Sequence, residues 1–153
     1  MNPLDNINWC GGGGDCVQML ALSPNGEYFQ CIRYMSSSLG EAQEPLCLGN
    51  INDGYLNSLK NQENFDLLRS ITRRSQSTDE CFYCPVAKGC SWCSAYNYEE
   101  FGTPNKRATN ICMNHKACGL ANVYYWNKLY KKLNINKVFE NHLSKQDIQK
   151  IIN

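Results

Sequence analysis

Four cysteines crowd the segment 81–93, which reads CFYCPVAKGCSWC and has the pattern C-x2-C-x5-C-x2-C. The whole chain of 153 residues contains ten cysteines, at positions 10, 16, 31, 47, 81, 84, 90, 93, 112 and 118. A chain of this length can bury only a modest core. The partners of these thiols therefore constrain the fold more than any other feature of the sequence. Such closely spaced cysteines hold a zinc ion, an iron–sulfur cluster, or one another as disulfides.

The N-terminal sequence bears on the choice between metal and disulfide. It reads MNPLDNINWCGGGGDC and has neither the basic region nor the apolar region of a signal peptide. We therefore expect a cytoplasmic protein with reduced thiols, in which close-set cysteines are more often metal ligands. A secreted, disulfide-bonded domain stays open as an alternative. The Cys81-x2-Cys84 pair suits zinc and iron–sulfur equally, because a tight turn lets two sulfurs converge on either centre.

Charge and hydropathy exclude two classes of partner. Lys and Arg number 15 against 14 Asp and Glu, which gives a net charge of +1, and hydrophobic residues make up 42% of the chain. Basic residues occur only as isolated pairs, so we expect no nucleic acid partner. No apolar run approaches the length of a membrane-spanning helix, so we expect no membrane partner.

The first half of the chain predicts a hairpin and one helix. Two β-prone runs flank SPNG, where Pro24 presets φ and Gly26 permits a positive φ, which predicts a β-hairpin over about 16–32. Residues 35–54 are rich in Ser, Gly and Asn and predict an irregular connection. A connecting helix is expected over about 55–74, capped by Asp53, with a break near Asn61 as an alternative. Its apolar stripe is Leu56, Leu59, Phe65, Leu68 and Ile71.

The second half of the chain predicts three further helices. A short helix is expected across SWCSAYNYEEFG, stopped by Gly102-Thr103-Pro104. Apolar residues at helical spacing predict a helix over 119–133, with two lysines in its last turn. Ser144 and Asp147 have capping-box spacing and predict a short final helix. The sequence thus predicts an α+β fold, with a small β-hairpin, helices and little regular sheet.

The spacing of eight cysteines points to a family. It reads C-x5-C-x9-G-x4-C, then C-x2-C-x5-C-x2-C, then a final cysteine. This pattern resembles the SPASM domain, the auxiliary-cluster module of radical S-adenosylmethionine enzymes that modify peptides. The strings GGGGDC, LGNINDG and GCSWCSAYNYEEFGTPNKRATNICMNHKA resemble the maturases of CXXX-repeat targets in particular. The resemblance covers about residues 9–122. It departs from the commonest family pattern at Cys93, where C-x3-C is replaced by C-x2-C.

The resemblance implies two [4Fe–4S] clusters with interleaved ligands. The first cluster would be held by Cys10, Cys16, Cys31 and Cys93. The second would be held by Cys81, Cys84, Cys90 and Cys112. Residues 1–122 would then form the SPASM domain, with a cysteine knot at 81–118, and residues 119–153 a C-terminal helical segment. A ligand taken from a distant segment closes a long loop, so cluster binding would be coupled to folding.

Several nearby residues fall outside this ligand scheme. Cys47 and Cys118 are expected to be free thiols, and His115 a structural or exposed side chain. His115 and Cys118 are rival ligands if Cys112 is not one. The run Gly11–Gly14 fits a close backbone approach to cluster sulfurs, and a flexible linker is the alternative.

The resemblance also sets the expected function. The chain contains no C-x3-C-x2-C motif and no βα-repeat barrel, so S-adenosylmethionine and a third [4Fe–4S] cluster are expected on a radical SAM barrel upstream or on a separate chain. We do not expect the chain to be active alone. With that barrel it would take part in oxidative modification of a ribosomal precursor peptide, such as thioether crosslinking. Its clusters would relay electrons and support or position the substrate. The alternative is a zinc-binding structural or interaction module without redox activity.

Overall fold

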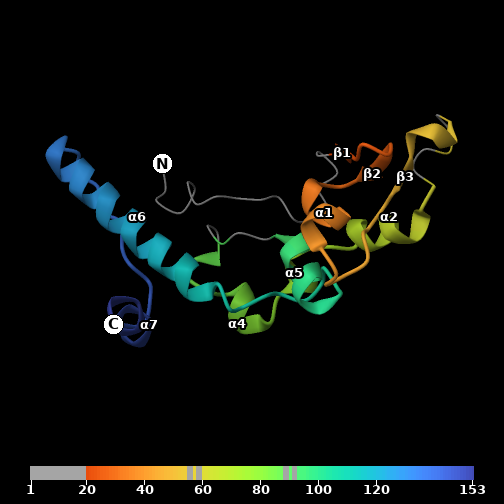
Figure 1. The fold of residues 1–153 in the computed structure, drawn as a ribbon. Helices are drawn as coiled ribbons and strands as arrows, with labels where there is room; N and C mark the ends of the chain where they lie inside the picture. The colour runs from red at the N-terminus through yellow and green to blue at the C-terminus, as the bar shows by residue number, and fades with distance from the viewer. Residues whose placement is uncertain (1–19, 55–56, 58–59, 88–89, 91–92) are drawn as a thin grey trace. The chain divides into compact units, whose positions relative to one another are not determined.

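The computed structural model describes residues 20–54, 57, 60–87, 90 and 93–153. These residues fall into two compact units. Unit 1 contains residues 78–87, 90 and 109–153, and unit 2 contains residues 20–54, 57, 60–77 and 93–108. Within the described ranges the secondary structure is mostly helical with one small antiparallel sheet (Figure 1). The α+β class expected from the sequence is confirmed.

Unit 2 begins with the predicted hairpin. Strands β1 (Ala21–Leu22) and β2 (Glu27–Phe29) pair antiparallel. Between them Gly26 has φ +81°, and its N–H donates to Ser23 O at 2.9 Å. The turn expected at SPNG is therefore confirmed, whereas Cys16 lies outside the described residues. A third strand, β3 (Gly49–Asn50), pairs with β2 in the stretch that the sequence predicted to be irregular.

Short helices connect these strands. The 3-10 helix η3 (Ile32–Tyr34) and α1 (Ser36–Leu39) follow β2, and the 3-10 helix η4 (Ile51–Asp53) follows β3. Asp53 lies inside η4, so the prediction that it caps the connecting helix is wrong. The cap is Asn61, whose side chain accepts a hydrogen bond from the backbone N–H of Asn64.

The predicted helix over 55–74 is shorter and divided. Helix α2 (Gln62–Arg69) ends at Ser70, and α3 (Arg73–Gln76) begins after Thr72. Thr72 is extended, with φ −130° and ψ 165°, and forms a capping box with Ser75. Two polar side chains therefore satisfy the orphan backbone donors of a new helix start, which favours two helices over a continuous one.

The core of unit 2 gathers residues from most of its elements. Helix α5 (Ser94–Phe101) ends as predicted at Gly102, which has a left-handed φ of +69°. It lies beside η3, and the ring centroids of Tyr34 and Tyr98 are 5.9 Å apart. The buried core consists of Phe29, Tyr34, Leu39, Leu46, Leu48, Leu68, Ile71, Ala95 and Tyr98.

Unit 1 is built on one long helix. Helix α6 (Cys112–Lys132) begins before the expected position at 119 and runs unbroken through 119–122, where the resemblance placed the end of the cluster domain. The following segment turns back along α6 and is held there by the Asn127 side chain. Its Oδ1 accepts from the N–H of Phe139 at 2.8 Å, and its Nδ2 donates to the carbonyl of Phe139 at 2.9 Å. The same unit includes the short helix α4 (Asp79–Phe82).

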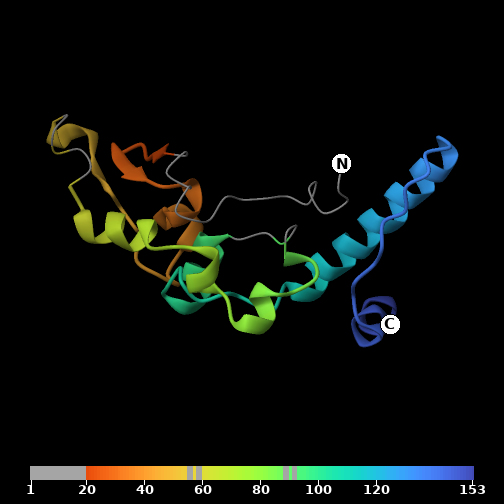
Figure 2. The same cartoon turned by 180° about the vertical axis from the view of Figure 1, so that it is seen from behind.

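The last helix closes unit 1. Helix α7 (Lys145–Ile152) is capped by Ser144, whose hydroxyl accepts from the N–H of Asp147 at 3.1 Å, as its sequence spacing predicted. Figure 2 shows α7 beside the N-terminal part of α6. Lys116 of α6 reaches Asp147 of α7 at 2.7 Å. None of the helices in the described ranges is long and apolar enough to span a membrane.

Candidate metal centres

Two cysteines of unit 2 stand at the starts of neighbouring helices. Cys31 is the N-cap of η3 and Cys93 is the N-cap of α5. The hydroxyl of Tyr34 donates to Ser94 Oγ at 2.8 Å, and these residues are only 1% and 5% exposed. Ser94 directly follows Cys93, and Tyr34 closes the η3 turn on the carbonyl of Cys31. This buried bond therefore joins the two helix starts and brings the two cysteines into one neighbourhood.

The electrostatics of unit 2 agree with this arrangement of the two thiols. Burial raises the pKa of Cys31, and the nearby Cys93 raises it further, against backbone hydrogen bonds that lower it. Both cysteines are half-buried and pack against the core. A pair of thiols that disfavour joint ionisation is well suited to a cation or a metal cluster, which would take up their negative charge.

Arg33 lies next to this pair. Burial acts to lower the pKa of its guanidinium, but the charges of Cys93, Glu99 and Cys31 outweigh burial and raise it. The guanidinium is held at 2.8 Å from the carboxylate of Glu99 and lies 5.6 Å from the ring centroid of Tyr96. One cation is thus fixed beside two half-buried thiols.

Three cysteines of unit 1 lie on a series of successive turns, with Cys81 and Cys84 one turn apart and Cys90 two turns after Cys84. The N–H of Cys84 donates to Cys81 O at 3.3 Å, that of Ala87 to Cys84 O at 2.9 Å, and that of Cys90 to Ala87 O at 3.4 Å. Side chains three residues apart in such turns point to similar sides. Thr78 starts the series, since its Oγ1 accepts from the N–H of Cys81 at 3.3 Å. Among the residues that the structure describes, these three thiols are nevertheless not gathered into a group that could hold a metal ion.

Cys112 is the first residue of α6, where the positive end of the helix dipole favours a thiolate. One turn further along α6 stands Lys116. The hydrogen bond to Asp147 raises the pKa of Lys116, burial opposes this, and the charges of Asp147, Cys84 and Cys112 raise it further. Cys84 and Cys112 therefore both lie within electrostatic range of the same ammonium group.

The expected ligands fall into the two units as follows. Cys31 and Cys93 belong to unit 2, and the second set belongs to unit 1. Cys90 and Cys93, although three residues apart, are thus placed in different units. Cys10, Cys16 and the Gly11–Gly14 run lie outside the described residues. In the part of the chain that the structure describes, no three His, Cys, Asp or Glu side chains form a ready-made metal site.

The remaining cysteines have other surroundings. Cys47 packs against the core of unit 2, and its thiol donates to Gly49 O at 3.3 Å. Cys118 is exposed on α6. Four thiolates are the donor set of a [4Fe–4S] cluster and also of a structural zinc ion. The donor chemistry of each proposed set therefore fits either centre.

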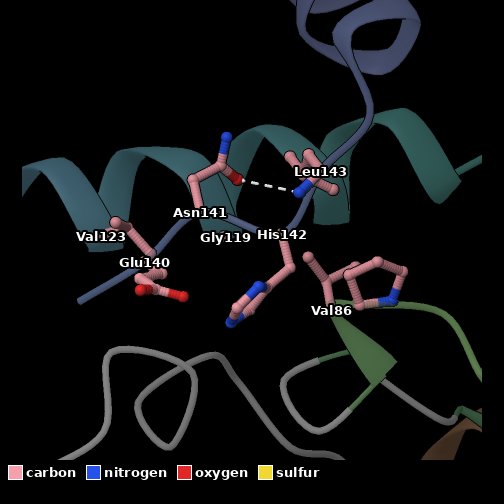
Figure 3. Close-up of a pocket in the computed structure, with 8 residues that line it drawn as sticks. Val86, Gly119, Val123, Glu140, Asn141, His142 and Leu143 are labelled. Atoms are coloured by element: carbon pink, nitrogen blue, oxygen red, sulfur yellow. Dashed lines mark hydrogen bonds between the residues drawn. The ribbon is translucent and has the colours of Figure 1, made fainter.

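A small pocket lies in unit 1 between α6 and the segment 140–143. The segment 140–143 runs alongside α6 at Gly119 and Val123, with Val86 nearby (Figure 3). The N–H of Leu143 donates to Asn141 Oδ1 at 3.1 Å. The pocket volume is about 20 Å³, enough for roughly one water molecule. It is too small for a peptide side chain of ordinary size, so we assign it no ligand.

Sequence reasoning missed the two cations at these centres. Lys116 carries a local signal, because it follows Cys112 by one helical turn. Arg33 stands two residues after Cys31 but has no pattern that would connect it to Cys93.

Comparison with known proteins gave no match: no family model, no curated protein and no solved structure matches this chain.

Proposed function

We propose that the chain is an auxiliary-cluster domain that holds two [4Fe–4S] clusters and serves a radical SAM peptide maturase. The observation that carries this proposal is the proximity of Cys31 and Cys93, which are 62 positions apart in the sequence. A simple four-cysteine zinc knuckle would keep Cys90 and Cys93 on one centre. In the interleaved ligand sets of a SPASM-like domain, Cys90 and Cys93 instead bind different clusters.

The second ligand set is supported by the backbone of unit 1. Cys81, Cys84 and Cys90 stand on consecutive hydrogen-bonded turns, and Cys84 shares the neighbourhood of Lys116 with Cys112. Cys112 is separated from Cys84 by 28 positions in the sequence, and the charges of both raise the pKa of Lys116. The helix start at Cys112 adds a favourable dipole for a negatively charged centre.

The proposed role of these centres would follow from ligation of each cluster by four protein thiolates. A cluster with four protein thiolates supplies one-electron redox chemistry without an open iron site for substrate. We therefore favour electron relay, with structural support and substrate positioning, over direct binding of the peptide. S-adenosylmethionine and a third [4Fe–4S] cluster would be supplied by a radical SAM barrel, and the substrate would be a precursor peptide that undergoes oxidative modification such as thioether crosslinking.

Metal analysis of anaerobically purified protein tests the proposal. We expect a brown protein with broad visible absorption and about eight irons per chain, four for each cluster. Cys47→Ala is a matched control, since Cys47 belongs to neither ligand set, and it should keep the full iron content. A colourless protein that contains two zinc ions instead of iron would refute the cluster assignment.

Paired substitutions test how the ligands are shared. Cys31→Ala, Cys90→Ala and Cys93→Ala should each remove about four irons. Because Cys31 and Cys93 are assigned to the same cluster, their double variant should lose no more iron than either single variant. The Cys31/Cys90 double variant should lose all of it. Equal losses in the two double variants would contradict the interleaved scheme.

A further inference from the structure

Helix α6 has one side that the rest of unit 1 covers. The segment that follows α6 returns along it before α7 begins (Figure 2). The Asn127 side chain holds the backbone of Phe139, and Lys116 forms its ion pair with Asp147 of α7. At about 100° per residue, Lys116 and Asn127 project from the same side of the helix. Both contacts of α6 with its own unit therefore use one side.

The other side of α6 is exposed to solvent. Tyr124 is 68% exposed and Tyr125 is 58% exposed, although both carry a large apolar ring. From residue 121 onward, the exposed side chains of α6 lie within about 120° of arc. We call them the Tyr–Lys face, which consists of Ala121, Tyr124, Tyr125, Lys128, Lys131 and Lys132. Tyrosine is enriched at protein interfaces because its ring supplies apolar contact area and its hydroxyl a hydrogen bond.

The lysines of this face have no acidic counterpart. Helix α6 contains no Asp or Glu, and within the described ranges none of these three lysines forms an ion pair. Lys128 precedes Lys131 and Lys132 by three and four positions, spacings at which like charges repel each other. The helix dipole favours the two lysines of the last turn, but Lys128 lies one turn earlier. Its ammonium group lies 6.0 Å from the ring centroid of Tyr124.

We propose that the Tyr–Lys face binds an acidic peptide segment that also carries apolar side chains. Carboxylates of such a segment would offset the repulsion among the lysines, and its apolar side chains would cover the two tyrosine rings. The proposal goes beyond the metal centres and does not depend on their ligands.

Three other occupants match this face less closely. A helix that lies on a membrane has its apolar residues on one face and its charges on another, whereas here tyrosines and lysines alternate. Single-stranded nucleic acid stacks its bases on free aromatic rings along a long basic groove, and the ring of Tyr124 is already in contact with Lys128. A second copy of the chain would bring the same three lysines against each other.

Fluorescence anisotropy with the full chain tests the proposal. The probe is a labelled synthetic peptide of about 16 residues, made of Glu and Leu at helical spacing, and a second probe has Gln in place of every Glu. We expect the parent to bind the acidic probe at least about tenfold more tightly than the Gln probe. Lys128→Gln with Lys131→Gln should weaken binding of the acidic probe about fivefold, and Tyr124→Ala with Tyr125→Ala about tenfold.

Matched controls change exposed side chains of unit 1 outside this face. Lys145→Gln with Lys150→Gln removes two lysines of α7, and Val138→Ala removes an apolar side chain that is 78% exposed. Both controls should bind the acidic probe as the parent does. Circular dichroism should show the parent's helix content in every variant, because each replaced side chain is exposed.

Several outcomes would overturn the proposal. One is a parent that binds neither probe, or that prefers vesicles of anionic lipid or a single-stranded RNA oligonucleotide to the acidic probe. A second is equal weakening in the lysine control, which would show that net charge and not this face controls binding. A third is a parent dimer in analytical ultracentrifugation that the double tyrosine variant dissociates, since a second copy would then occupy the face.

Discussion

Replacement of Tyr34 by phenylalanine tests how unit 2 holds its two thiols together. The substitution keeps the buried ring and removes the hydroxyl that donates to Ser94 Oγ at 2.8 Å. A typical hydrogen bond contributes about 1 kcal/mol, and a buried group left without its partner costs about 1–3 kcal/mol. Since Ser94 is 5% exposed, we expect Tyr34→Phe to lower the free energy of unfolding by about 1–2 kcal/mol.

The same change should also affect the first centre. The lost bond joins η3 to the start of α5, so the helix that carries Cys93 is less firmly positioned against Cys31. We expect Tyr34→Phe to reduce metal occupancy of that centre. The centre in unit 1 should keep its metal.

Tyr98→Phe is the matched control. Tyr98 also donates a 2.8 Å hydrogen bond, to the carbonyl of Glu44, and its ring lies 5.9 Å from that of Tyr34. It lies on α5 one turn beyond the residues next to Cys93. Its loss should destabilise the fold by a similar amount without affecting metal content.

Urea unfolding followed by circular dichroism measures stability, and metal analysis follows binding. A double-mutant cycle with Ser94→Ala should give a coupling energy of about 1 kcal/mol for the pair. Additive effects of Tyr34→Phe and Ser94→Ala would refute the claim that this bond joins the helix starts. Equal metal loss in Tyr34→Phe and Tyr98→Phe would show that general destabilisation, not positioning, controls the centre.

Two further predictions concern the hairpin turn at Gly26 and the ion pair between Lys116 of α6 and Asp147 of α7. Gly26→Ala should lower the free energy of unfolding by about 2 kcal/mol, since φ is +81° and a Cβ would approach Ile51 Cγ2 to 2.7 Å. Gly40→Ala, with φ +59° and nothing within 4 Å, should cost less, and equal urea midpoints for the two variants would contradict this. The hydrogen bond from Lys116 lowers the pKa of Asp147 below its usual 3.8, so this pair contributes stability above that pH and loses it as pH falls through the lowered value. Asp147→Asn should therefore reduce the melting temperature at pH 7 more than at pH 2, and an equal reduction at both would be contrary to the assignment.

Local signals in the sequence predicted the elements whose ends depend on neighbouring residues. The SPNG turn, the Gly102 stop and the Ser144 cap are each set by a backbone conformation or a side-chain bond within four positions. The early start of α6 was missed, because the apolar spacing that predicted this helix begins after 119 and CMNHKAC was interpreted as a source of possible ligands. Gly119 is buried inside the helix, so its fit to the interior outweighs its low helix propensity.

The candidate centres were predictable only in part. Cysteine spacing identified the possible ligands, since thiols are few and distinctive. The two ion pairs near these cysteines were not predictable, because Arg33 pairs with Glu99 across 66 positions and Lys116 with Asp147 across 31. Such pairs are set by the packing of helices, and an exposed lysine or arginine has the same sequence signal whether or not it has a partner.

The division of the chain into units has a consequence for its synthesis and its evolution. The described polypeptide passes from unit 2 to unit 1 after Ser77, returns before Cys93, and leaves again after Ala108. During translation, unit 2 cannot complete its fold until Ala108 has left the ribosome, and by then residues 78–87 and 90 of unit 1 have been made but α6 has not. Neither unit can be deleted, duplicated or exchanged as a continuous gene segment. The two units must therefore be inherited together, as one continuous gene segment.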